Sequence, residues 1–256
     1  MNNTKIVTFN LRNSYVNDYD SINGFSHRAG MVCDKILEEK PDVIAFQEII
    51  QPALTLLKRM LPEYLFLGHF READYSGEGL YTAIRTENIE LLGLEVIWLS
   101  PTPYIAGSRF SDQSECPRTC VMTHIRNKNT GEMMRIYNVH LDHISNSARE
   151  LGMSAVFDYV KEQNKKLSLP YIILGDLNAT PDSGVIKMCN DADGIFDATR
   201  DIPYTFHAFG QKQSKIDYIF LSDNFKKRVA DCSAWTEEFD GIYLSDHFPI
   251  SVTIAE

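Results

Sequence analysis

The sequence predicts an α/β protein in which two packed β-sheets carry helices on their outer faces. Short runs rich in Val, Ile, Tyr and Phe recur along the whole chain, and Gly, Pro, Asn and Asp separate them. Few segments have the three- and four-residue apolar spacing of an amphipathic helix. The 256 residues include 44% hydrophobic and 23% charged residues, which is typical of globular proteins. Many strands with few helices between them favour a sandwich over a regular βαβ barrel.

Eight segments are expected to form strands, because each is a short apolar run bounded by turn-forming residues. In chain order they are 5–10, 42–46, 80–84, 120–125, 135–141, 171–174, 215–221 and 248–254. Helices are expected around 29–37 and 148–160, where apolar residues recur at helical spacing, and between Pro52 and Leu61. No low-complexity tract or linker rich in Pro, Ser or Gly interrupts this order, so residues 1–256 are expected to form a single domain.

The net charge limits the class of partner. The chain has 25 Lys and Arg residues against 35 Asp and Glu residues, which gives a formal charge of −10. Neutralisation of phosphates by basic residues supplies most of the non-specific affinity for nucleic acids. The acidic balance therefore counts against a general nucleic-acid binder, although a local site can oppose the global sign.

Signals for membrane insertion or export are not visible. The longest uncharged stretch, 96–108, has 13 residues and contains two prolines, whereas a spanning helix needs about 20 apolar residues. The first residues show no basic segment followed by an apolar core. The five cysteines are scattered, and no second cysteine pair completes a zinc site with Cys116 and Cys120. We expect no integral membrane association, reduced thiols and a cytoplasmic location.

Polar side chains stand where five of the expected apolar strands begin or end. Taken singly, each fits a turn, the first charge of a helix or a structural histidine. Five such clusters that combine carboxylates, amides and imidazoles instead favour a common site, because strand ends on a rigid scaffold often present catalytic groups. The clusters are Asn10, Gln47-Glu48, Asn138 to His143, Asp176 to Asn178, and Ser245-Asp246-His247.

The residue types in these clusters suit hydrolysis at phosphorus. Hard oxygen ligands such as Glu48, Asp246 and the Asn10 amide favour magnesium or manganese over zinc. A carboxylate such as Asp176 can orient and deprotonate an attacking water. Asn178 lies two residues further on, hence on the same face of an extended chain, and can donate an amide hydrogen to a phosphate oxygen. The two histidines can stabilise the charge that develops at phosphorus.

Six motifs in this order resemble the endonuclease/exonuclease/phosphatase (DNase I-like) superfamily of metal-dependent phosphoesterases. They are TFNLR (8–12), FQE (46–48), NVHLDH (138–143), GDLNATPDS (175–183), IDYIF (216–220) and SDHFPI (245–250). The superfamily includes nucleases, deadenylases, inositol polyphosphate phosphatases and neutral sphingomyelinases. The resemblance implies a four-layer α/β sandwich, two mixed sheets flanked by helices, with the site at one edge of both sheets.

The resemblance also implies roles for single residues. Asn10 and Glu48 resemble the metal-site amide and carboxylate, with Asp246 beside the same ion or at the other edge of the site. Asp176 is similar to the water-activating aspartate, and Asn178 to its phosphate-binding neighbour.

Further roles concern the histidines and the substrate. His140 resembles a phosphate-contacting histidine, and Asp217 resembles the carboxylate that orients His247. Arg118 is similar to a phosphate-contacting arginine, and Asn138 is expected to contact substrate. Glu78 is expected to orient His140, and the segment 205–207 is expected to lie near the substrate.

Two alternatives remain open at this point. The pattern Asn138-x-His140-x-Asp142-His143 resembles the HxHxDH motif of metallo-β-lactamase-like zinc hydrolases, but Asn in the first position would remove one zinc ligand. Measuring bound zinc and testing for activation by added magnesium would distinguish this zinc-hydrolase family from the endonuclease/exonuclease/phosphatase superfamily. The second alternative is a catalytically silent binding module of the same fold.

The sequence leaves the substrate open among a small molecule, a lipid head group and nucleic acid, and it leaves the oligomeric state open. Loops 15–25, 71–79 and 100–116 are expected to make this choice, since a shared fold does not settle it. The first has no basic residue and the second is net acidic. Basic clusters at 161–166 and 226–228 are expected to be solvated faces. The acidic surface favours a small phosphoester, or one that is bound only at a local site, over a long polyanion.

Overall fold

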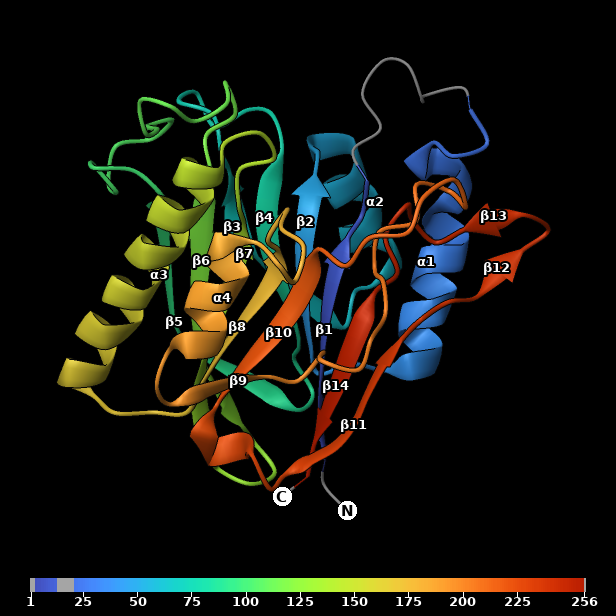
Figure 1. The fold of residues 1–256 in the computed structure, drawn as a ribbon. Coiled ribbons are helices and arrows are strands. Elements are labelled where there is room, and N and C mark those ends of the chain that lie inside the picture. The colour runs from blue at the N-terminus through green and yellow to red at the C-terminus, as the bar shows by residue number, and fades with distance from the viewer. Residues whose placement is uncertain (1–2, 13–20, 256) are drawn as a thin grey trace.

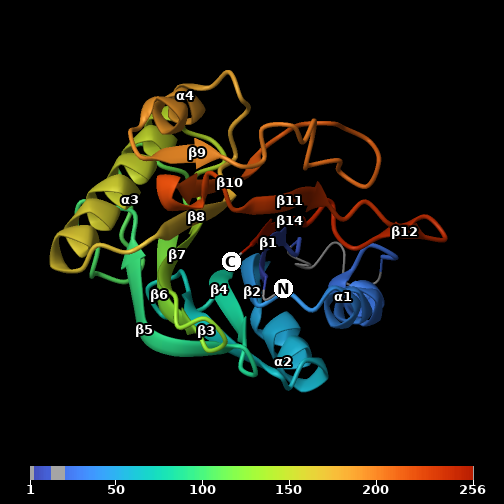
Figure 2. The ribbon, with the colours of Figure 1, turned by 90° about the horizontal axis from the view of Figure 1, so that it is seen from below.

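Two six-stranded β-sheets pack face to face, and two helices cover the outer face of each sheet (Figure 1). This computed structural model describes residues 3–12 and 21–255. Viewed from below, the layers follow one another as α3 and α4, one sheet, the other sheet, and then α1 and α2 (Figure 2). The predicted four-layer α/β sandwich with two mixed sheets is confirmed.

The order of the elements alternates short strands with four helices among the described residues. In chain order they are β1 (Thr4–Asn10), α1 (Phe25–Glu39), β2 (Val43–Ile49), α2 (Gln51–Met60), β3 (Tyr64–Phe70), β4 (Gly79–Arg85), β5 (Ile89–Trp98), β6 (Thr119–Asn127), β7 (Met133–His140), α3 (Asn146–Lys166), β8 (Tyr171–Asp176), α4 (Gly184–Asp191), β9 (Ile195–Asp197), β10 (Asp217–Ser222), the 3₁₀-helix η1 (Asp223–Phe225), β11 (Val229–Ala234), β12 (Glu238–Phe239), β13 (Ile242–Tyr243) and β14 (Ile250–Ile254).

Each sheet is built around one parallel pair of strands. The first sheet has the order β11-β14-β1-β2-β4-β3, and the second has the order β5-β6-β7-β8-β10-β9. β1 runs parallel to β2 and β7 runs parallel to β8, whereas the other paired neighbours are antiparallel. A helix joins each parallel pair, as such a crossover requires. The polar ends of β1, β2, β7 and β8 therefore lie at one edge of the sandwich.

Three apolar clusters fill the spaces between the four layers. Ile6 of β1 packs between the sheets, while its neighbour Val7 packs under α1 and α2. In β8, Ile172 likewise packs between the sheets, while Ile173 packs under α3 and α4. Successive side chains of a strand point to opposite faces. Central strands covered on both faces need continuous apolar runs, which is how these segments read in the sequence.

All eight expected strands and all three expected helices are present, with bounds that differ by a few residues. The structure adds the short helix α4, whose first turn is capped by the Ser183 hydroxyl, which accepts from the Ile186 N–H at 3.4 Å. It also adds strands β3, β5, β9, β11, β12 and β13. No helix in the described part of the chain is long and apolar enough to span a membrane.

Candidate active site

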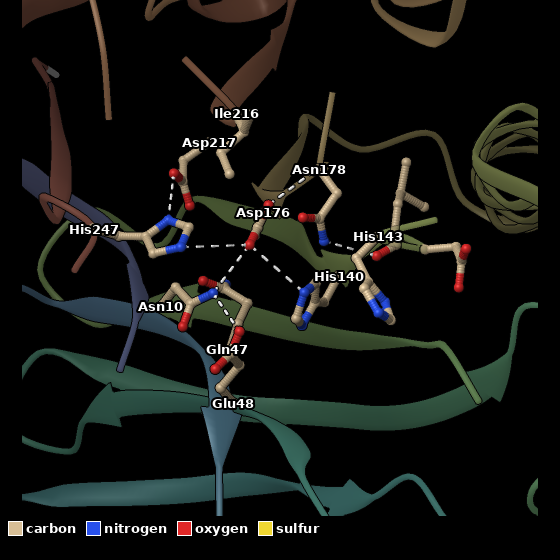
Figure 3. A network of polar contacts seen from close by, with 12 residues as sticks. Asn10, Gln47, Glu48, His140, His143, Asp176, Asn178, Ile216, Asp217 and His247 are labelled. Carbon is tan, nitrogen blue, oxygen red and sulfur yellow. Dashed lines mark hydrogen bonds and ion pairs between the residues drawn. The ribbon is translucent and has the colours of Figure 1, made fainter. Parts of the chain in front are cut away.

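The site forms where the parallel pairs of both sheets end. Asn10 at the end of β1 lies in register with Gln47 of β2, and His140 at the end of β7 lies in register with Asp176 of β8. The antiparallel strand β10 begins at Asp217, directly opposite Asp176. These strand ends bring residues 10, 48, 140, 176 and 217 together although they are spread over most of the chain (Figure 3).

Asp176 is the centre of the polar network. Its Oδ2 accepts a hydrogen bond from Asn10 Nδ2 at 3.0 Å, and it lies 3.5 Å from His140 Nε2 and 3.9 Å from His247 Nε2. Its Oδ1 accepts from the backbone N–H of Asn178 at 2.8 Å. The side chain is almost completely buried, with an exposed fraction of 2%. One carboxylate therefore contacts side chains from both sheets (Figure 3).

The glycine before Asp176 permits this placement. Gly175 has φ +143°, and a Cβ at this position would lie 1.8 Å from the Val139 carbonyl oxygen. Only glycine accommodates both the backbone angle and this close approach of β8 to β7. The Gly-Asp pair in the sequence therefore reflects a backbone requirement as well as a chemical one.

Burial raises the pKa of Asp176 to about 7, and the nearby charge of Asp217 adds to this rise. The charge of His247 and the hydrogen bond from the Asn178 N–H act in the opposite direction. A carboxyl group with a pKa near neutrality can accept a proton from water more readily than an ordinary aspartate can. Asp176 therefore has the properties of a general base.

Asp217 and Thr205 hold His247 from the side opposite Asp176. His247 Nδ1 lies 2.8 Å from Asp217 Oδ2, and the same oxygen accepts from Thr205 Oγ1 at 2.6 Å. Thr205 Oγ1 in turn accepts the backbone N–H of Asp217 at 3.0 Å. The ring of Phe206 packs against the imidazole with centroids 4.9 Å apart. Asp217 is thus placed to hold the His247 ring through Nδ1.

Burial acts to lower the pKa of His247, but its carboxylate neighbours outweigh this effect and raise the pKa to about 10. The charge of Asp217 and the hydrogen bond to it contribute most, followed by Asp176 and Asp246. In contrast, burial and the charges of Arg118 and Arg71 lower the pKa of His140 well below its ordinary value. Near neutral pH the site therefore contains one protonated and one neutral imidazole.

Glu48 reaches the site through an irregularity in β2. The pairing with β4 shifts register between Phe46 and Ile49, and Glu48 has φ +58°. A left-handed conformation is uncommon for a residue other than glycine, and bulges often redirect side chains at functional sites. The Glu48 carboxylate accepts a hydrogen bond from Asn10 Nδ2 at 3.0 Å. The bulge thus aims a half-buried carboxylate at Asp176.

The described residues include two groups that can hold a metal ion, each with one ligand atom per residue within 4.8 Å of the others. They are Glu48, His140 and Asp176, and Asp176, Asp217 and His247. The first group is open to solvent on the side of Glu48, whereas all three residues of the second group are buried. The Glu48 carboxylate is the half-exposed ligand of the first group, which leaves a side open for waters or substrate.

The other two expected metal ligands, Asn10 and Asp246, have polar partners within the protein. Asn10 directs its NH₂ group at both carboxylates, while its Oδ1 accepts the Arg12 N–H at 2.9 Å. It is a donor to the potential ligands in this orientation, and its amide would have to turn over to present oxygen. Asp246 is buried and lies 3.4 Å from Arg12 Nη1. Burial also raises the pKa of Asp246.

The expectation that Asn138 contacts substrate is wrong. Asn138 is completely buried between the sheets, where its Nδ2 donates to the carbonyls of Phe46 at 3.0 Å and Tyr81 at 3.3 Å. Its Oδ1 accepts from Gln47 Nε2 at 2.9 Å. Every polar atom of the amide is used within the protein, so Asn138 joins the two sheets below the site.

Asn178 lies at the rim of the site in a left-handed conformation with φ +49°. Its Nδ2 donates one hydrogen bond to the Leu141 carbonyl at 3.1 Å. A primary amide carries two hydrogens, so the second is available to a phosphate oxygen. The position of Asn178 is therefore compatible with its expected role.

Arg118 lies against the same site, just before β6. Its exposed fraction is 5%, and its Nη2 donates to His143 Nδ1 at 3.0 Å. Arg118 and His140 line a common cavity with Glu48. The expected phosphate-contacting arginine is thus next to the catalytic candidates, and it is not a surface side chain.

Glu78 does not orient His140, contrary to expectation. It forms an ion pair with Arg71, with 2.5 Å between Nη1 and Oε2, and among the described residues no hydrogen bond or ion pair joins it to His140. His207 is buried, and its ring stacks on Phe248 with centroids 4.1 Å apart. Burial lowers the pKa of His207 to about 4. His207 therefore acts as a neutral packing residue.

The zinc-hydrolase alternative does not fit the cluster at 138–143. Asp142 accepts the backbone N–H groups of Ile144 at 3.0 Å and Ser145 at 2.7 Å, as a turn residue before α3 does. In the part of the chain that the structure describes, neither potential metal group includes Asp142 or His143. Within this motif, Asp142 thus stabilises the turn before α3, and His143 holds the Arg118 side chain.

Sequence reasoning gave neither Arg71 nor Gln47 a role of its own. Gln47 is completely buried and bridges Asn138 and Thr8 Oγ1. Its position directly before Glu48 in the sequence is the one feature that could have indicated a role near the site. Arg71 is the first residue of loop 71–79, which is expected to choose the substrate, but the acidic composition of this loop gives no indication that its arginine lines the site. Part of the expected substrate loop 15–25, namely residues 15–20, lies outside the described residues.

Comparison with known proteins agrees with this geometry. The model of the Endonuclease/Exonuclease/phosphatase family matches residues 7–247. An endonuclease/exonuclease/phosphatase from Bacteroides vulgatus is similar in structure, with a TM-score of 0.88, 26% identity and coverage of 99% of both chains. No match was found among curated proteins.

Two further structures extend the comparison. A mannosyl-6-phosphatase from Bacteroides thetaiotaomicron has a TM-score of 0.87 at 26% identity, with coverage of 97% of this chain and 98% of that one. D. rerio TDP2 complexed with a single-strand DNA product has a TM-score of 0.77 at 21% identity and covers 99% of both chains. The latter likeness bears on the fold alone.

Proposed function

The chain belongs to the endonuclease/exonuclease/phosphatase family, and on this premise we propose that it hydrolyses phosphoester bonds with Mg²⁺ as its cofactor, which Mn²⁺ can replace. Members of this family are hydrolases of phosphoester bonds. The observation that carries the proposal is the position of Asp176, buried between Asn10 and His140 with His247 on its other side. A buried base surrounded by hydrogen-bond donors suits the attack of water on phosphorus.

Glu48 would hold the cation, with waters and the substrate phosphate as its other ligands. A divalent ion at this position supplies positive charge that polarises the phosphoryl group and stabilises the leaving oxygen. Asn10 supports the site by donating to both Glu48 and Asp176, which reduces the repulsion between the two carboxylates.

Asp176 accepts the proton of the attacking water, whose oxygen forms the new bond to phosphorus in line with the leaving oxygen. The raised pKa of Asp176, about 7, matches this task near neutral pH. His247, whose pKa is raised to about 10, carries a proton on Nε2 and donates it toward the leaving oxygen as the P–O bond breaks. Asp217 fixes the direction of that imidazole through Nδ1.

The remaining donors stabilise charge on the non-bridging oxygens. Asn178 offers its second amide hydrogen, and neutral His140 offers one N–H. Arg118 adds a guanidinium group from the adjoining cavity. Removing one such preorganised donor typically lowers the rate by about 10²–10³-fold.

We propose a small phosphorylated substrate in preference to a long polyanion. The acidic net charge of −10 supports this choice. The similarity at 26% identity to a protein described as a mannosyl-6-phosphatase points the same way.

The test is a substrate panel assayed with Mg²⁺: single-stranded DNA, RNA, abasic duplex, sphingomyelin and sugar phosphates. We expect hydrolysis of a small phosphoester, and loss of at least about 100-fold in Asp176→Asn. Asp158→Asn, an exposed carboxylate on α3, is the matched control. Full activity of Asp176→Asn would contradict the mechanism, and inactivity of the wild type on every substrate would favour a binding module.

A further inference from the structure

The two donors that the first sheet directs at Asp176 come from different segments of the chain. Asn10 ends β1 and His247 precedes β14, and their side-chain nitrogens lie 3.0 Å and 3.9 Å from Asp176 Oδ2. β1 and β14 are antiparallel neighbours, but their pairing ends at Thr8 and Ile250, before either donor is reached. The spacing between Asn10 and His247 is therefore set by contacts outside the β-ladder.

Beyond the end of this ladder the two chain segments bond to different neighbours. The Leu11 N–H donates to the Gln47 carbonyl at 3.1 Å, next to β1 on the side of β2. The Phe248 N–H donates to the Thr205 carbonyl at 2.7 Å. Among the described residues the ladder thus does not continue across the space between the end of β1 and the segment 244–248, which we call the seam.

Arg28 of α1 crosses this seam with its guanidinium group. Its Nη2 donates to the Leu11 carbonyl at 2.9 Å, and its Nη1 donates to the Leu244 carbonyl. Its Nε donates to the Asn23 carbonyl at 2.7 Å, which fixes the group to the start of α1. One planar group therefore holds the backbone that leaves β1 and the backbone that leads into β14.

The Arg28 side chain is suited to this role because it is buried and its donors have fixed directions. Its exposed fraction is 0%, and its Cζ lies 5.7 Å from the centroid of the Phe25 ring. The bonds to Leu11 and Leu244 are buried as well, so breaking them would leave polar groups unsatisfied in the interior. A guanidinium group presents its donors in a rigid, planar fork. The distance between the two carbonyls is therefore tightly constrained.

We propose that Arg28 is a positioning residue for catalysis, which sets the spacing between Asn10 and His247 by bridging the seam. This role rests on the proposed function, in which both donors act next to Asp176. The held carbonyls lie one residue after Asn10 and three residues before His247, so a shift of either carbonyl is passed on to the donor beside it. Displacing a reacting group by about 1 Å can lower a rate about 100-fold. Arg28 acts through the backbone in this role and exchanges no proton.

Lys35 provides a matched control on the same helix. It lies about two turns further along α1 and is likewise buried, and its Nζ contacts Glu39 at 2.8 Å and Glu237 at 2.5 Å. Glu237 directly precedes β12, which runs beside α1 (Figures 1 and 2). Lys35 thus joins α1 to the chain before β14 without touching the seam. Its loss should weaken the fold and leave the spacing of the two donors unchanged.

The first test measures hydrolysis of 4-nitrophenyl phosphate and bis(4-nitrophenyl) phosphate with Mg²⁺ by Arg28→Met, Arg28→Lys and Lys35→Met. On the substrate that the wild type hydrolyses faster, Arg28→Met should lower kcat about 10–100-fold and change KM less than about 3-fold, because the displaced donors act in the transition state. Arg28→Lys keeps the charge and part of the hydrogen bonding, so its kcat should lie between these values. Lys35→Met should keep kcat within about 3-fold of the wild type, although both Met variants should unfold at lower urea concentration.

The second test measures amide hydrogen exchange by mass spectrometry in metal-free protein, independently of activity. In Arg28→Met, peptides that contain Leu11 or residues 244–248 should exchange at least about 10-fold faster than in the wild type, while peptides of β8 keep their rate. In Lys35→Met the peptides at the seam should keep the wild-type rate. If Arg28→Met does not fold, Arg28→Lys gives the same comparison with a smaller increase.

Three outcomes would overturn this role. The first is a wild-type kcat in every folded Arg28 variant. The second is an equal fall of kcat in Arg28→Met and Lys35→Met, which would indicate a general loss of stability. The third is exchange at the seam that stays at the wild-type rate, or that rises equally in β8. If the wild type hydrolyses neither of these substrates nor any member of the panel above, the proposed function fails, and the exchange comparison alone then decides whether Arg28 holds the seam.

Discussion

Replacing Asp217 by Asn tests the assignment of His247 as a protonated group. The substitution preserves the shape of the side chain but removes the charge that lies 2.8 Å from His247 Nδ1. Both side chains are buried, with exposed fractions of 6% and 2%, so solvent screens this interaction little. Thr205 and His247 both contact Oδ2 of Asp217, so an Asn that places its amide oxygen there keeps both hydrogen bonds and loses only the negative charge.

The magnitude follows from the contact. A hydrogen bond to a charged group contributes about 1.5–3 kcal/mol, and one pKa unit corresponds to about 1.4 kcal/mol. A neutral acceptor contributes about 0.5–1.5 kcal/mol, so loss of the charge should lower the pKa of His247 by at least about 1 unit from its present value of about 10. Asp176 and Asp246 still act to raise the pKa in the variant, whereas burial acts to lower it.

The effect on stability has a defined sign. A histidine whose pKa is higher in the folded than in the unfolded state stabilises the fold fully below about pH 6.5, its ordinary value. This contribution is lost progressively as the pH rises to about 10. The difference in unfolding free energy between the wild type and Asp217→Asn should therefore be largest near pH 6 and small at pH 10.

The assay is a titration of the histidine Cε1–H signals by NMR in metal-free protein, together with urea unfolding at pH 6, 8 and 10. Asp201→Asn, an exposed carboxylate, is the control and should leave the His247 titration unchanged. Activity of Asp217→Asn with Mg²⁺ should fall about 100-fold through kcat. If the His247 signal of the variant still titrated near pH 10, Asp217 would not be what holds the proton.

The other predictions concern the neighbours of this pair, the sheet interface and the cation. Thr205→Val removes the hydroxyl that bonds Asp217 and should lower the unfolding free energy in urea by about 1–3 kcal/mol, with kcat reduced more than KM is changed. Asn138→Leu leaves the Gln47 amide and two buried carbonyls without their partner. It should cost about 2–4 kcal/mol in the same measurement, while KM of the folded fraction stays unchanged. Excess EDTA should abolish hydrolysis without changing the circular dichroism spectrum, and Mg²⁺ should restore it.

The layer order and the edge at which the site lies could be predicted because both depend on local patterns. Continuous apolar runs such as 43–46 and 171–174 indicate strands covered on both faces. Polar residues that follow such runs, Glu48 and Asp176, then mark the ends of parallel strands, which share one edge of a sheet. The strand β9 has only three residues, and the edge strands β3 and β5 contain apolar runs whose side chains are partly exposed, such as Leu65 and Leu94, so their pattern does not distinguish them as covered strands.

Asn138 shows why the sequence could not assign every polar residue correctly. Asn138 and His140 share one face of β7, since side chains alternate along a strand. One step of two residues corresponds to about 6.6–6.8 Å, which is enough to move Asn138 from the edge into the interior of the sandwich. Asn138 is buried there because the opposite sheet covers it and supplies the carbonyls of Phe46 and Tyr81 as hydrogen-bond acceptors.

The packing of the two sheets also explains why the pKa of Asp176, the candidate base, is raised. β1 and β2 contribute Asn10 and Glu48, while β7 and β8 contribute His140 and Asp176, so each sheet holds half of the site. Directly below, Gln47 and Asn138 join the two halves by a buried hydrogen bond of 2.9 Å. The burial that raises the pKa of Asp176 to about 7 exists only while the sheets are held at this separation. The proton affinity of Asp176 is therefore a consequence of the sheet interface, and a variant that loosens this interface should lower the pKa of Asp176 toward that of an exposed aspartate.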